Sequence, residues 1–154
     1  MSKIVDIYTA LADLIESTLP GYTRLPNPYS VDTNTYLHLK NGYGIGIGAG
    51  RDTERYVGCI ATYERVFTII LVKIMSTTQN NTGKRVIIEE ALLTDHTKLK
   101  NKIYQESTLG NIAIKSTILD DQGIGFIDPG KNKYLSLEMN CYIEYQEDPT
   151  AIIV

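Results

Sequence analysis

Apolar and polar positions along this chain follow two periods, one helical and one extended. In residues 2–17 the apolar positions recur every three or four residues, which predicts an amphipathic helix that ends before Pro20-Gly21. Residues 84–106 repeat the helical spacing. Both predicted helices therefore offer one apolar stripe to a core. The first stripe comprises Ile4, Ile7, Tyr8, Leu11, Leu14 and Ile15, and the second Ile88, Leu92, Leu99 and Ile103.

A period of two predicts strands in the segments before the middle of the chain. Residues 35–40 and 43–49 both alternate, and the Asn41-Gly42 pair between them is typical of a hairpin turn. We expect a short strand within residues 21–25 as well. Residues 51–55 are mostly charged and predict a loop after the hairpin.

The most apolar segment follows this loop. Residues 56–76 predict a strand, with an expected break near residues 61–64. Residues 65–75 are β-branched and almost continuously apolar. This composition is typical of a central strand that is covered on both faces.

The last third of the chain predicts three further strands. Residues 111–119 and 124–127 flank an expected turn at residues 120–123, and residues 128–130 form a second turn. Residues 134–146 alternate throughout, with Leu135, Leu137, Met139, Cys141, Ile143 and Tyr145 on one face. Because the strands come in runs, we expect one α+β domain over residues 1–154. Its architecture would be a two-layer sandwich, a mostly antiparallel mixed sheet packed with two amphipathic helices.

Composition narrows the class of protein. The chain has 154 residues, of which 43% are hydrophobic and 21% charged, so it can bury a core without disulfides or metals. The net charge of −3 argues against a dedicated nucleic-acid binder. No apolar run approaches membrane-spanning length, and we expect no secretory signal and no membrane contact.

Candidate chemistry is sparse. Only two cysteines and two histidines are present, without CxxC or HExxH spacing, and we expect no metal site, no cofactor and no catalytic residue. The alternating glycines of residues 42–50 lead into a charged segment rather than a helix, so they do not form a dinucleotide fingerprint. Residues 125–132 match a phosphate loop except that Asn132 replaces Ser or Thr. A small intracellular enzyme that uses Cys141 with His96 remains the alternative of a different class.

The order of these elements resembles the tail terminator proteins of long-tailed bacteriophages. The resemblance covers the first helix at residues 2–17, the proline-rich link, the strand at residues 63–72, the helix at 84–106 and the final strand at 135–145. The glycines of residues 44–50 depart from the bulkier alternation of the family. The match is one of pattern and carries no residue-level signature.

The resemblance implies a structural virion protein that is not an enzyme. Proteins of this family form hexamers, so six copies would form a ring. The ring would cap the tail tube, stop its polymerisation and join the head at the neck. Its partners would be the tail tube protein and the connector or neck proteins, and DNA would pass through the lumen without specific binding. The ring would be assembled in the host cytoplasm and retained in the virion. An acidic chain fits such a lumen because it repels phosphates.

Two related readings stay open: another neck or head-completion protein, and the tube side of a contractile machine. A monomeric adaptor is a third. Charged strand ends often set the register of neighbouring subunits. We therefore expect interface residues in the charged segment, at the start of the next strand, in the loop of residues 77–83 and in the apolar segment 148–154. The named candidates are Arg51, Asp52, Glu54, Arg55, Tyr56, Tyr63, Glu64 and Arg65.

Overall fold

The computed structural model describes residues 3–25, 41–55, 61–75, 82–127 and 133–147. The predicted strand at residues 35–40, the turn at 128–130, most of the loop at 77–83 and the segment 148–154 lie outside these ranges. The same is true of His38, Tyr56 and Cys59.

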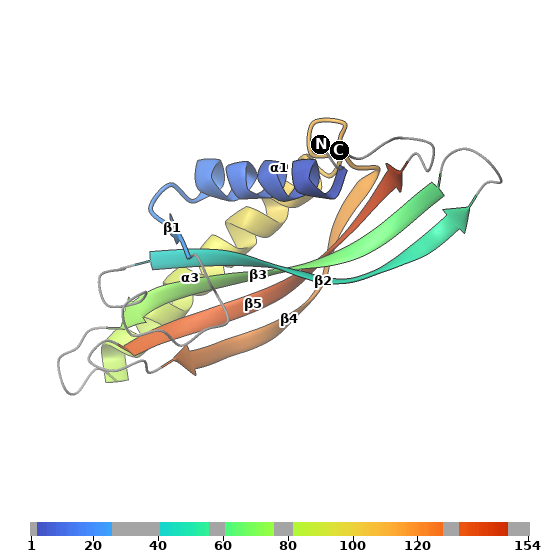
Figure 1. The fold of residues 1–154 in the computed structure, drawn as a ribbon. Coiled ribbons are helices and arrows are strands. Elements are labelled where there is room, and N and C mark those ends of the chain that lie inside the picture. Colours follow the sequence, from blue (N-terminus) through green and yellow to red (C-terminus); the bar gives the residue numbers. More distant parts are fainter. Residues whose placement is uncertain (1–2, 26–40, 56–60, 76–81, 128–132, 148–154) are drawn as a thin grey trace.

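The described residues form two layers. In chain order the elements are α1 (Lys3–Thr18), β1 (Thr23–Arg24), β2 (Asn41–Arg55), β3 (Ala61–Met75), α3 (Thr82–Gln105), β4 (Lys115–Ile127) and β5 (Lys133–Glu147). Both helices contribute to one core cluster with the same face of the sheet (Figure 1). The predicted α+β sandwich is confirmed.

The sheet is mixed and mostly antiparallel. Its strand order is β1-β2-β3-β5-β4, and only the short β1 runs parallel to its neighbour β2. β3 lies at the centre and pairs with β5 over its whole length, from Ala61 opposite Glu147 to Met75 opposite Lys133. The central strand predicted from the apolar segment is therefore confirmed, and it starts at Ala61 without the break expected at residues 61–64.

The core lies between the helices and one face of β3 and β5. All six alternating residues that were predicted on β5 are at most 1% exposed. The helix stripes are also confirmed, with Ile7, Leu11 and Ile15 of α1 and Leu92, Leu99 and Ile103 of α3 fully buried. On the opposite face of the sheet Ile70 and Val72 form a second cluster with Leu25 and Tyr134. β3 is therefore buried on both faces, as its composition predicted.

The predicted hairpin turn at Asn41-Gly42 is wrong. Asn41 lies opposite Lys73, and Gly42 lies opposite Val72 on one side and Thr23 on the other. The glycine serves close packing instead of a turn. A Cβ atom on Gly42 would lie 3.0 Å from Leu25 Cδ2 and 3.1 Å from Val72 Cγ2.

The predicted loop at residues 51–55 is also wrong, because β2 continues to Arg55. A bulge allows this continuation. Ile47 lies opposite Phe67 and Gly50 opposite Arg65, so β2 uses one residue more than β3 over this interval. The bulge turns Gly50 to the face of the sheet on which Arg65 lies.

The predicted turn at residues 120–123 is wrong in the same way. β4 is one strand with register shifts between Ile118 and Asp120 and between Asp121 and Ile124. Gly123 adopts a φ of 73°, and its N–H donates to Asp121 Oδ1 at 2.9 Å. The turn-like sequence of residues 120–123 thus forms a bulge within β4. β4 also starts later than expected because the residues just after α3 adopt positive φ, 50° at Leu109 and 69° at Asn111.

Candidate functional site

The predicted interface residues gather where β2 ends and β3 begins, a region here called the distal end (residues 50–55 and 61–65). The register places Arg51 opposite Glu64, Asp52 opposite Tyr63, Glu54 opposite Thr62 and Arg55 opposite Ala61. Figure 1 shows β2 and β3 running on past α1 at this end. Of the eight candidates only Tyr56 lies outside the described residues. The other seven are brought together at one projecting edge of the molecule.

Arg51 and Glu64 form an exposed ion pair at the distal end. Arg51 Nη2 lies 3.4 Å from Glu64 Oε1, and the side chains are 74% and 25% exposed. An exposed pair of this kind contributes only about 0–1 kcal/mol to folding. Both charges can therefore exchange their mutual contact for a partner's group at little cost.

Arg65 is held in place by the bulge of β2. Its Nη1 donates to the Gly48 carbonyl oxygen at 2.9 Å, and its guanidinium carbon lies 5.5 Å from the centre of the Tyr63 ring. A Cβ on Gly50 would lie 2.8 Å from that guanidinium carbon and 2.5 Å from Tyr63 Cε1. The side chains of Arg65 and Tyr63 therefore pack directly on the backbone of Gly50, where a Cβ atom would displace them.

Tyr63 connects the distal end to the core. Its ring centre lies 5.9 Å from that of Tyr145, which is 1% exposed and belongs to the main core cluster. Aromatic pairs at this separation contribute about 0.5–1.5 kcal/mol beyond the area that they bury. The charged edge is thus a preorganised surface on a rigid base, suited to recognition of another macromolecule.

Cys141 and His96, the residues of the enzyme alternative, are both core residues. Cys141 is fully buried beside Ile118 and Phe67, and burial raises the pKa of its thiol to about 12. Such a thiol stays protonated and unreactive at neutral pH. His96 is 8% exposed, and burial lowers the pKa of its imidazole, opposed by Asp121 and reinforced by Lys100.

A polar cluster that the sequence analysis missed joins α3 to the sheet. Tyr22 donates its hydroxyl to Asp95 Oδ2 at 2.6 Å, and Lys73 Nζ lies 3.2 Å from the same oxygen. Burial, with the nearby Asp95, raises the pKa of Tyr22 above its ordinary value. The only signals were a lysine near the end of an apolar strand and an acid beside an apolar stripe. The three residues lie far apart in sequence, and their groups satisfy one another, which is typical of a structural tie.

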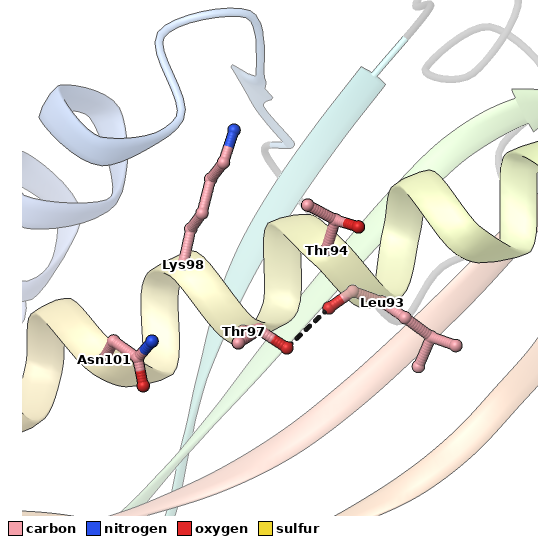
Figure 2. A pocket seen from close by; sticks show the side chains of 5 residues that line it. All are labelled: Leu93, Thr94, Thr97, Lys98 and Asn101. Atoms are coloured by element: carbon pink, nitrogen blue, oxygen red, sulfur yellow. Dashed lines mark hydrogen bonds between the residues drawn. The ribbon is translucent and has the colours of Figure 1, made fainter.

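A shallow surface depression lies on α3 and is lined by Leu93, Thr94, Thr97, Lys98 and Asn101 (Figure 2). Thr94 and Thr97 donate their hydroxyls to the carbonyl oxygens of Glu90 and Leu93, at 2.8 and 2.9 Å. Their hydrogen-bonding capacity is therefore directed at their own helix. Nothing in this lining converges on a bound small molecule.

The described residues contain no group of three or more His, Cys, Asp or Glu side chains that could hold a metal ion. None of the helices in the described ranges is both long enough and apolar enough to cross a membrane. Comparison of the chain with protein-family models and with curated proteins finds no match.

Proposed function

We propose that this chain is a structural protein of a bacteriophage tail, a terminator whose copies form a ring on the end of the tail tube. The ring stops tube growth and presents the surface that joins the head. Six copies are expected from the family that the chain resembles. DNA passes through the lumen without specific contacts.

The distal end is the observation that carries this proposal. It projects past α1, carries charges of both signs, and is anchored to the core through Tyr63 and Tyr145. Charged groups on a rigid edge give register and specificity between protein partners more than raw affinity. That is the property a subunit needs to meet identical neighbours on a template.

The charge of the chain supports the same role. A net charge of −3 favours a lumen along which DNA slides, since phosphates are repelled by acidic walls. A strongly basic lumen in the assembled ring would count against the proposal.

The first test is the mass of the purified chain in solution over a concentration series, with negative-stain images of the same samples. Six-fold rings with an open centre would support the proposal. If the chain stays monomeric, the same measurement is repeated with purified tail tubes, because the tube can act as the template. A chain that neither forms rings nor caps tubes would overturn the proposal.

The second test asks whether the distal end makes the contact. Arg51→Glu places two acids opposite each other, at residues 51 and 64, and we expect ring formation or tube capping to weaken at least about tenfold. Lys98→Glu is the matched control, an equal charge reversal on the exposed side of α3. Equal loss in both variants would show that only net charge matters.

A third test separates the classes of protein. Replacing Cys59 and Cys141 together by alanine should leave assembly intact in a structural protein. The same change would abolish turnover in an enzyme that uses a cysteine nucleophile.

A further inference from the structure

Three large apolar side chains are half-exposed on α3 and near the end of β4. Val86 of α3 is 52% exposed, Leu93 of α3 is 47% exposed and Phe126 of β4 is 47% exposed. Together they are called the flank patch. Exposed apolar side chains that gather in one place mark interaction surfaces more often than scattered ones do.

The helix geometry places Val86 and Leu93 on one side of α3. Val86 and Leu93 are seven residues apart, so they lie in line along α3. Tyr104 continues that line and donates its hydroxyl to the Ile118 carbonyl oxygen of β4 at 2.9 Å, which identifies this flank as the β4 side. Figure 2 shows Leu93 on the opposite flank of α3 from Lys98.

Phe126 belongs to the same surface by its register. It lies opposite Leu135, a core residue on the helix-facing side of β5. In Figure 1 the end of β4 and the beginning of α3 lie at the same end of the sheet. The flank patch is thus shared between α3 and the last residues of β4.

The chain itself carries a segment of matching chemistry. Residues 151–154 read Ala-Ile-Ile-Val, beyond the end of β5 at Glu147. Fully extended, the seven residues after Glu147 reach at most about 24 Å. Between Leu135, beside the patch, and Glu147, β5 runs for twelve residues, or about 40 Å at the rise of a strand.

A chain's own 148–154 segment is therefore too short to reach Phe126 of its own flank patch. We propose that the flank patch binds the 148–154 segment of a second copy of this chain. The contact joins two different surfaces, so it is heterologous and links copies head to tail, as a ring requires. The inference rests on the self-assembly in the proposed function, and it names the segment that links neighbouring subunits.

Cysteine cross-linking tests the contact directly. Val86→Cys and Ile153→Cys are introduced into one chain in a Cys59→Ser background, and the full-length protein is treated with a short bismaleimide. Cys141 is buried and does not compete. We expect a ladder of cross-linked dimers and higher species. In the matched control Lys98→Cys replaces Val86→Cys, which moves the thiol to the opposite flank of α3, and we expect the ladder to be at least about tenfold weaker.

Two results overturn the inference. A product cross-linked only within one chain would mean that the segment folds back on its own molecule. A ladder no stronger than that of the control would mean that the flank patch has another occupant.

Assembly measurements separate this inference from the proposed function. Leu93→Asp and Ile153→Asp should each weaken ring formation or tube capping at least about tenfold, and the double variant should add little, since both remove one contact. If rings form normally in both variants, the proposed contact between the flank patch and the 148–154 segment is wrong, but the proposed function is unaffected. The absence of rings and capping in the unmodified chain would sink the proposed function itself.

Discussion

The two strands that flank β3 are held to it in different ways. β5 presents an unbroken row of buried apolar residues, each opposite an inward-facing residue of β3, such as Leu137 opposite Leu71 and Met139 opposite Ile69. Among the described side chains of β2, only Tyr43 and Ile45 belong to the core cluster on that face. Beyond them Ile47 is 53% exposed and glycines alternate along the strand.

On the β2 side polar contacts replace side-chain packing. Tyr43 donates its hydroxyl to Glu16 of α1 at 2.5 Å, Arg65 donates to the Gly48 carbonyl oxygen, and Lys73 Nζ donates to Asn41 Oδ1 at 3.4 Å. The comparison teaches that β5 makes the core, whereas β2 provides a backbone platform that other side chains can lie on. Three predictions test this division, and a fourth concerns the pH dependence that α3 gives to stability.

The largest effect is expected at β5. Leu137→Ala empties a site that is 1% exposed and should lower the free energy of unfolding by about 2–5 kcal/mol. Ile47→Ala on β2 is the matched control and should cost less than about 1 kcal/mol, because the side chain is already half in water. Urea denaturation of both variants makes the measurement. Equal losses would show that β2 is packed as tightly as β5.

The next effect is expected at the tie between β2 and α1. Tyr43→Phe removes a hydrogen bond to a carboxylate and should cost about 1–2 kcal/mol. Glu16→Gln keeps an acceptor and should cost less. A double-mutant cycle measures the coupling between the two positions, and strictly additive losses would contradict the contact.

A smaller effect is expected where β2 lacks side chains. Gly50→Ala places a Cβ against Tyr63 and the Arg65 guanidinium, whose ends can move aside, so the loss should be about 1 kcal/mol. Gly21→Ala is the control, since its Cβ would meet nothing within 4 Å. Thermal unfolding distinguishes them. A neutral Gly50→Ala would mean that the platform tolerates side chains.

The smallest effect concerns pH and the buried His96 of α3. Burial lowers the pKa of this imidazole, so the unfolded chain binds the proton more readily than the folded one. The stabilising contribution is complete above the ordinary histidine pKa of about 6.5 and declines as the pH falls below it. Between pH 7 and 5.5 we expect a loss below about 1 kcal/mol in urea titrations.

Two histidine variants test whether His96 causes this loss of stability between pH 7 and 5.5. His96→Leu should flatten the dependence over this interval, whereas His38→Gln should keep it. A slope that survives His96→Leu would assign the titration to another group.

Prediction from sequence succeeded where side chains alone determine the local structure. The face of β5 from Leu135 to Tyr145 and the stripes of α1 and α3 were all identified by period. Prediction from sequence failed where an inserted residue changes the register between two strands. The bulges near Gly50 and Gly123 read locally as a loop and a turn, and only the neighbouring strands keep them extended.

The candidate site was predicted only in part. Arg51 to Arg65 could be proposed as one cluster because antiparallel neighbours bring the two sides of a connection together. The tie between Tyr22, Lys73 and Asp95 could not, because the three groups come from separate elements and no local pattern marks their meeting. The bulge that seats Arg65 on Gly50 has no periodic signature either.

The pairing of β3 with β5 also has a consequence for how the chain is made. β3, at the centre of the sheet, pairs with β5, since Ala61 lies opposite Glu147 and Met75 opposite Lys133. This pairing cannot form until β5 has been synthesised. About half of the 154 residues follow β3, and until β5 has been made one edge of β3 keeps its backbone N–H and C=O groups unpaired. Contacts so distant in sequence are slow to form and leave a nascent chain prone to aggregation. A ribosome-bound chain halted before residue 133 should therefore bind chaperones, and release them once β5 has been translated.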